Sequence, residues 1–197
     1  MQFVRGITDA SQFCLNLRWL MRERCHNPTS WGTELSKLTR NYLGYSRALG
    51  LLMGADPNPD EIRMLAEQFR LDSEELVTVP LYTRDATILQ LNIRYLVDAI
   101  PHGQKDKMAK AIGVTPPQIS RWASGEIKPH KRNIGQLLKL HGIDQDIDLT
   151  SIPLFLSLEP LSGFDQRYWV ANRVQDLPAA EIAKIYPALR KLLRYDD

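Results

Sequence analysis

The chain has 197 residues, of which 44% are hydrophobic and 24% charged, so it is long enough for one medium or two small globular domains. It has no apolar run long enough to span a membrane, and its first residues lack the basic-then-apolar order of a secretory signal, so we expect a cytoplasmic protein that does not enter a membrane. Its two cysteines, Cys14 and Cys25, fit a reducing compartment and lack the spacing of a zinc site.

Two short motifs occur twice along the chain. LNLRWL at 15–20 returns as LNIRYL at 91–96, and LVTVPLY at 76–82 returns as LTSIPLF at 149–155. The second pair keeps both the apolar pattern and the proline.

A third pair lies between these motifs. Residues 53–72 and 124–144 each contain a glycine, a proline-containing turn and a helical pattern. Three pairs in the same order, at offsets between 71 and 76, predict two tandem copies of one small unit at roughly 15–82 and 91–155. The apolar positions that match in the third pair are Ile62, Leu65 and Phe69 in the first copy and Ile134, Leu137 and Leu140 in the second.

The first copy is predicted to form a helix over Thr33–Arg40, then a long turn, then a helix with Gly44, Gly50 and a large apolar share. Over residues 31–71 its five basic residues are matched by five acidic ones. This copy therefore carries no net charge.

The second copy is predicted to be helical throughout. Apolar spacing indicates a helix over Ile88–Ala99, which the Pro101-His102-Gly103 sequence ends, and a second short helix over Gln104–Ile112. Gly113 then supplies a turn with positive φ. The inner face of the second helix is expected to carry Met108, Ala109 and Ile112.

Two adjacent prolines are predicted to begin the next helix. Thr115 is a good N-cap, and Pro116 falls at the first helical position, where the missing N–H costs nothing. Pro117 still lies in the first turn, so the prolines start a helix sharply. In this helix Ile119 and Trp122 are expected to face inward, Gln118, Ser120 and Arg121 to face outward, and Gly125 to end it.

Two short helices joined by a glycine turn have the plan of a helix-turn-helix. The stretch QKDKMAKAIGVTPPQISRWASGEIKP at 104–129 resembles the lambda-repressor-like (Cro/CI-type, XRE) helix-turn-helix family. The resemblance implies a DNA-binding transcriptional regulator, a repressor of bacterial or phage type. The residues that carry it are Gln104, Ala109, Gly113, Ile119, Ser124, Gly125 and Pro129, followed by Leu137, Leu138 and Ile143 in the fourth and fifth helical segments.

The repeat and the resemblance together imply an all-α chain of two tandem helix-turn-helix domains and a C-terminal helical extension. We place the first, diverged copy at 1–84, the second, DNA-reading copy at 85–158 and the extension at 159–197.

Charge favours DNA binding by the second copy over the alternative of a helical packing module. Residues 104–141 hold eight basic and two acidic residues, a net charge of +6 in a chain whose total is +2. The basic residues cluster in the elements of a helix-turn-helix that meet phosphates when it lies in a major groove.

The candidate DNA contacts follow from side-chain chemistry. Arg121 can bind guanine O6 and N7 with two donors, and Gln118 can pair with adenine N6 and N7. Thr115, Pro116 and Pro117 are candidates for contact with a thymine methyl group. The expected phosphate ligands are Gln104, Lys105, Ser120, Lys128, Lys131 and Arg132.

The first copy allows two interpretations. It is either a second base reader or a packing or dimerisation module, and we favour the second because its charge is neutral. A homodimer would then present two second copies to a palindromic DNA site. The candidate second reader consists of Tyr42, Tyr45, Ser46 and Arg47.

Residues 177–195 predict an amphipathic helix that Pro187 kinks or breaks. Its apolar stripe either covers the protein's own core or forms an oligomer contact. The stripe consists of Ile182, Ile185, Tyr186, Leu189, Leu192 and Leu193.

Enzyme motifs are absent from the sequence. Its four histidines lack metal or nucleophile spacing, and no phosphate-binding glycine loop occurs, so we expect no catalytic residue, metal or cofactor. The expected function is that of a nucleoid-associated transcriptional regulator that binds double-stranded DNA. The alternative is an antitoxin-like module that binds a partner protein through the first copy or the C-terminal tail.

Overall fold

The computed structural model describes residues 6–25, 27–100, 103–159, 161, 170, 174 and 177–192. Every regular element in these ranges is helical and none is a strand, which confirms the all-α fold class. In the same ranges no helix is both long and apolar enough to cross a membrane. His26 and His102 lie outside the described residues.

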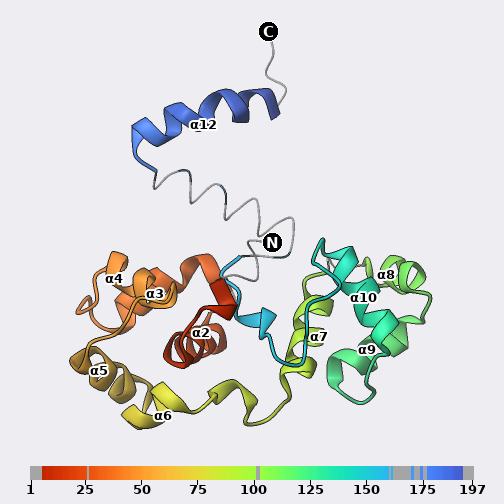
Figure 1. Cartoon of the computed structure of the whole chain (residues 1–197), viewed down its shortest axis with the longest axis horizontal. Coiled ribbons are helices and arrows are strands. Elements are labelled where there is room, and N and C mark those ends of the chain that lie inside the picture. Colours follow the sequence, from red (N-terminus) through yellow and green to blue (C-terminus); the bar gives the residue numbers. More distant parts are fainter. Residues whose placement is uncertain are drawn as a thin grey trace.

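The elements form two halves that lie side by side (Figure 1). The first half contains α2 (Gln12–Arg24), α3 (Trp31–Leu38), α4 (Tyr45–Leu52), α5 (Pro59–Phe69) and α6 (Ser73–Thr78), with the 3₁₀ turns η1 (Pro28–Ser30) and η2 (Leu81–Thr83). The second half contains α7 (Ile88–Asp98), α8 (Lys105–Ile112), α9 (Pro116–Ser124), α10 (Lys131–Leu140) and η3 (Leu154–Leu156).

Each half is built around its own set of buried apolar side chains. Trp31, Leu35 and Leu65 are fully buried in the first half, and Leu96 and Ile119 in the second. Each half therefore has an apolar core of its own.

The halves meet at η3, which lies between α2 and α7 (Figure 1). The Phe155 ring is edge-on to Trp19, with ring centroids 5.8 Å apart. Arg22 donates from Nη1 to the Phe155 carbonyl at 3.0 Å and lies over the Tyr95 ring at 5.0 Å from its centroid. Arg18 is buried and reaches the Leu156 carbonyl at 3.3 Å. These contacts join the two cores.

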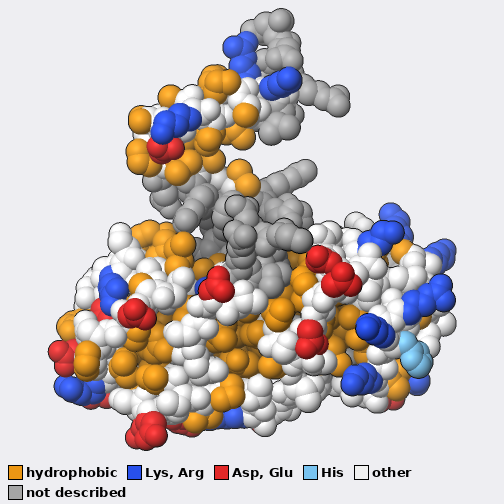
Figure 2. Space-filling view, in the orientation of Figure 1, with side chains coloured by type: hydrophobic (Ala, Val, Ile, Leu, Met, Phe, Trp, Pro, Cys, Tyr) orange, Lys and Arg blue, Asp and Glu red, His pale blue; other side chains and the backbone are white. Residues whose placement is uncertain are grey.

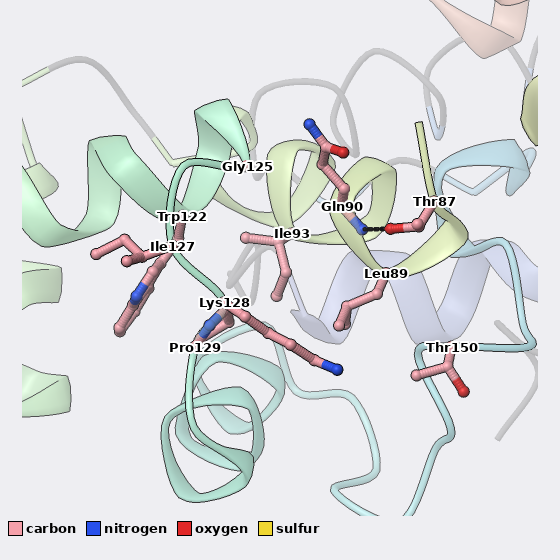
Figure 3. Close-up of a pocket in the computed structure, with 10 residues that line it drawn as sticks. All are labelled: Thr87, Leu89, Gln90, Ile93, Trp122, Gly125, Ile127, Lys128, Pro129 and Thr150. Atoms are coloured by element: carbon pink, nitrogen blue, oxygen red, sulfur yellow. Dashed lines mark hydrogen bonds between the residues drawn. The ribbon is translucent and has the colours of Figure 1, made fainter. Parts of the chain in front are cut away.

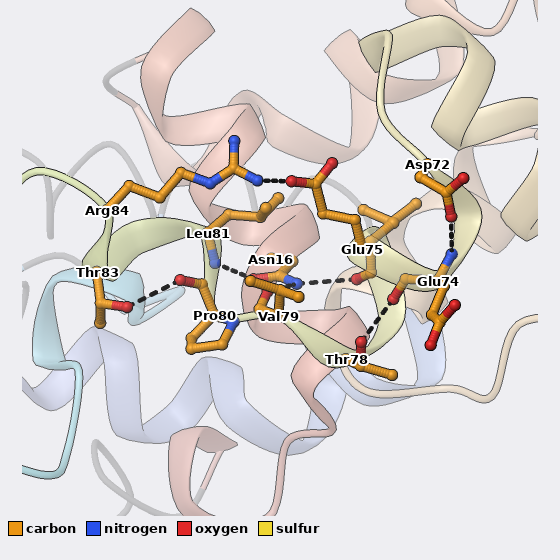
Figure 4. A network of polar contacts seen from close by, with 11 residues as sticks. Asn16, Asp72, Glu74, Glu75, Thr78, Val79, Pro80, Leu81, Thr83 and Arg84 are labelled. Atoms are coloured by element: carbon orange, nitrogen blue, oxygen red, sulfur yellow. Dashed lines mark hydrogen bonds and ion pairs between the residues drawn. The ribbon is translucent and has the colours of Figure 1, made fainter.

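Asn16, a buried residue of α2, forms hydrogen bonds to the segment that ends the first half (Figure 4). Asn16 Nδ2 donates to the carbonyls of Leu76 at 2.9 Å and Val79 at 2.7 Å, and Oδ1 accepts from the Leu81 amide at 3.0 Å. The side-chain amide therefore satisfies backbone groups where α6 ends and η2 begins. Nearby, Arg84 pairs with Glu75.

Asn92 makes a similar set of contacts in the second half, although the amide that it accepts from lies one residue later in the repeated motif. Its Nδ2 donates to the carbonyls of Leu149 at 2.9 Å and Ile152 at 2.7 Å, and its Oδ1 accepts from the Phe155 amide at 3.3 Å. Asn16 and Asn92 are the shared asparagines of the LNLRWL and LNIRYL motifs. Each one fastens the closing segment of its half to that half's first helix.

The arginine of each motif also has a repeated role. Arg18 donates from Nε to the Leu52 carbonyl at 2.7 Å, at the end of α4. Arg94 donates from Nε to the Ala123 carbonyl at 3.2 Å, at the end of α9. In both halves the first helix therefore holds the last turn of the helix that follows the turn.

The two halves differ in that turn. The connection from α3 to α4 spans residues 39–44, whereas residues 113–115 connect α8 to α9. Arg40 and Asn41 both have positive φ, so α3 ends at Leu38 rather than at the expected Arg40. The longer turn expected for the first copy is confirmed.

One of the expected helical segments is absent. No fifth helix forms at Ile143, because Gly142 takes a φ of +67° and the chain leaves α10 in a turn, although Ile143 is buried. Leu140, one of the apolar positions that match between the copies, is 50% exposed.

Helix α12 (Ala179–Leu192) continues through Pro187, so of the expected kink or break the break does not occur, and the helix extends away from the two halves in Figure 1. One proline removes a single hydrogen bond, and the helix continues around it. Ile182, Ile185 and Leu189 are half-buried and Tyr186 is exposed. Leu193 lies outside the described residues.

Replacing Asn92 by Ala is expected to lower the free energy of unfolding by about 2–4 kcal/mol, because two carbonyls and one amide lose their partner in a buried place. Asn16→Ala should cost a similar amount. The measurement is urea unfolding followed by far-UV circular dichroism. Asn133→Ala on α10, where the side-chain amide makes no hydrogen bond within the described chain, is the control and should change stability by less than about 0.5 kcal/mol.

Candidate nucleic-acid interface

The start of α9 has the geometry expected from the two prolines. Gly113 ends α8 with a φ of +77°, Thr115 is the N-cap in extended conformation, and Pro116 and Pro117 are the first two helical residues. Neither proline removes a hydrogen bond, because the first amides of a helix have no partner within it. The turn between the helices is therefore tight and its exit direction is fixed.

Gln118 takes part in this cap. Its Oε1 accepts from the amide of Thr115 at 2.9 Å and from the Thr115 hydroxyl at 3.2 Å. The predicted adenine-reading amide is thus folded back on the helix start in the DNA-free chain. It has to leave the cap before it can meet a base.

The inner face of α9 is the one expected. Ile119 and Trp122 are 0% and 4% exposed and pack into the same core as Met108, Ala109 and Ile112 of α8. Burying Ile119 and Trp122 forces Gln118, Ser120 and Arg121 outward, because helical residues at these offsets lie on opposite faces.

The end of α9 is held by two side chains from α7. Arg94 donates to the Ala123 carbonyl at 3.2 Å, and Gln90 donates from Nε2 to the Ser124 carbonyl at 3.2 Å. These bonds satisfy carbonyls that have no partner within the helix. Sequence reasoning did not assign Gln90 or Arg94 a role, although Arg94 belongs to the repeated LNIRYL motif.

Gly125 is required at this end for two reasons. Its φ is +79°, which ends α9 in the left-handed conformation. A Cβ atom at this position would also collide with the amide of Gln90. Gly125 thus leaves room for the Gln90 side chain at the end of α9.

The predicted DNA contacts share one exposed surface. Figure 2 shows Lys and Arg side chains gathered at the end of the molecule that α8, α9 and α10 form. All eleven predicted contact residues of this half are exposed: Gln104, Lys105, Thr115, Pro116, Pro117, Gln118, Ser120, Arg121, Lys128, Lys131 and Arg132.

Arg121 has one ionic neighbour in this surface. Its Nε lies 3.5 Å from Glu126 Oε1, and both side chains are more than half exposed. Exposed pairs of this kind are weak and are screened by salt. Arg121 can therefore exchange this carboxylate for another acceptor.

Arg47, the basic member of the predicted second reader, is held by an acid. It donates from Nε and Nη2 to the two carboxylate oxygens of Glu61, both at 2.7 Å, and from Nη2 to the Asp56 carbonyl at 2.8 Å. Glu61 is 5% exposed, and the bonds from Arg47 lower the pKa of its carboxyl below the usual value. The rest of this set, Tyr42, Tyr45 and Ser46, is exposed.

The segment that carries this surface also matches a known family. Residues 103–144, which include α8, α9 and α10, match the helix-turn-helix family model. Comparisons with curated proteins and with solved structures gave no match.

This segment is similar to helix-turn-helix domains, in keeping with the lambda-repressor-like (XRE) resemblance of the sequence, and the match indicates a DNA-binding regulator. The family consists in general of regulators rather than enzymes.

Gly125→Ala is expected to lower the free energy of unfolding by about 1–2 kcal/mol, because Ala is strained at positive φ and displaces Gln90. Gly135→Ala is the matched control. Gly135 lies within α10, where a Cβ would make only an ordinary contact, so Ala should stabilise the protein by up to about 1 kcal/mol. Thermal unfolding of both variants measures the effects, and equal signs would contradict the account of Gly125.

Proposed function

We propose that the chain is a sequence-specific transcriptional repressor that reads the major groove with α9. The observation that carries the proposal is that α9 is fixed at both ends while Gln118, Ser120 and Arg121 face solvent. A recognition helix held in this way needs no ordering of its backbone before it enters a groove.

Phosphate binding would flank α9 on both sides. Gln104 and Lys105 begin α8, and Lys131 and Arg132 begin α10, so donors and cations sit at two helix starts. Lys128 in the loop after α9 extends the same set. Contacts of this kind fix orientation, whereas Arg121 and Gln118 would supply sequence preference.

We further propose that the two halves, 1–84 and 85–158, are tandem copies of one unit. Hydrogen bonds that recur in both halves support this. The asparagine of each repeated motif, Asn16 or Asn92, bonds to the closing segment of its half, and the arginine, Arg18 or Arg94, bonds to the end of α4 or α9. Residues 159–197 would form the C-terminal extension.

The first half would serve protein contact rather than base reading. The charge of Arg47 is neutralised by Glu61, and the turn before α4 is longer than the turn before α9. Tyr42 is 64% and Met53 56% exposed, which is more typical of a protein-contact surface than of a phosphate-binding one. The same surface would serve the alternative function, in which an antitoxin-like chain binds a partner protein there or through α12.

Arg121→Ala is expected to weaken binding to the preferred DNA site by about 1–3 kcal/mol and to relax the preference at one base pair. Lys131→Ala should weaken binding to all sequences alike and reduce the salt dependence. Fluorescence anisotropy with sites recovered by genomic pull-down and sequencing measures both. Arg47→Ala is the control from the first half and should leave DNA binding unchanged. An unchanged preference in Arg121→Ala would contradict the placement of α9.

A homodimer is expected to protect a palindromic site whose half-sites are about 34 Å apart, because one recognition helix covers too few base pairs for specific affinity. Footprinting combined with light scattering tests this. A monomer that protects an asymmetric site, with Arg47→Ala as damaging as Arg121→Ala, would show instead that both halves of one chain read DNA.

A further inference from the structure

A pocket of about 510 Å³ lies beside the predicted DNA surface (Figure 3). It is enclosed by the start of α7, the end of α9, the loop that follows α9, and Thr150. Its volume falls within the range of roughly 300–1,000 Å³ that is usual for small-molecule sites.

The lining of the pocket is apolar with a polar edge. Leu89 and Ile127 supply its exposed apolar surface, whereas Trp122 and Ile93, which also border it, are almost fully buried. Pro129 completes the apolar part, and Thr87, Gln90, Lys128 and Thr150 form the polar part.

Lys128 is the single charged residue among those that line the pocket. Figure 3 shows its side chain extending along the pocket from the loop. Nearby acids are already engaged, since Glu126 pairs with Arg121 and Asp148 accepts from the Thr150 hydroxyl at 2.6 Å. Within the described chain, Lys128 has no ion pair.

We propose that this pocket binds a small molecule with an apolar body and one anionic group, a carboxylate or sulfonate. The apolar body packs against Leu89 and Ile127, and the anion pairs with the ammonium group of Lys128. An anion fits best because the one charge at the site is an unpaired cation in a strongly basic surface.

The ligand would also oppose DNA binding, a consequence that rests on the proposed function. Lys128 is a candidate phosphate ligand, so an anion paired with it removes one contact and places negative charge near the DNA backbone. The pocket also borders the end of α9, at Trp122. Ligand and DNA therefore weaken each other by the same factor.

The test uses 8-anilinonaphthalene-1-sulfonate, an apolar anion whose emission rises in apolar pockets, with the full chain and no DNA. Lys128→Met, which keeps the apolar stem, should lower the affinity for the probe about fivefold. Thr150→Phe, which fills the pocket from an exposed edge, should lower it at least as much. Lys131→Met is the matched control, an exposed lysine of the same surface that does not line the pocket, and should leave probe affinity unchanged.

Equal probe affinity in wild type, Lys128→Met and Thr150→Phe would overturn the proposal, as would equal losses in Lys128→Met and Lys131→Met. Circular dichroism of each variant establishes that it is folded. In a second arm, the probe should weaken binding to the selected duplex in wild type but not in Thr150→Phe, and an unchanged DNA affinity at saturating probe would overturn the antagonism. If the chain binds no DNA but probe binding still depends on Lys128, the proposed function fails while the pocket assignment stands.

Discussion

Helix α7 carries the contacts on which the geometry of the second half depends. Asn92 fastens the closing segment of the half to it, while Arg94 and Gln90 hold the last carbonyls of α9. Gly125 leaves room for the Gln90 side chain because it has no Cβ. The direction of the recognition helix is thus set by side chains of a helix that carries none of the predicted DNA contacts.

The two halves share these internal contacts but differ in their exposed surfaces. In the first, Arg18 holds the end of α4 as Arg94 holds α9, yet the turn before α4 is longer and Arg47 is bound to Glu61. In the second, Arg121 has only an exposed partner. A shared internal scaffold therefore supports a basic, polar face in one half and a neutral, partly aromatic face in the other.

Local rules predicted the elements of the second half well. The cap at Thr115, the two prolines and the inward side of α9 follow from backbone chemistry and spacing, which act within a few residues. Long-range partners were not predictable in this way. The Arg47–Glu61 pair and the Gln90 contact at Gly125 join distant segments, and the helix expected at Ile143 fails because Gly142 turns the chain.

We propose that the chain meets DNA through its second half alone. Amide hydrogen exchange of the full chain, with and without a selected duplex, tests this most directly, since exchange reports protection segment by segment. New protection is expected across residues 115–132 and none across 39–53. Protection of 39–53 as strong as that of 115–132 would contradict it.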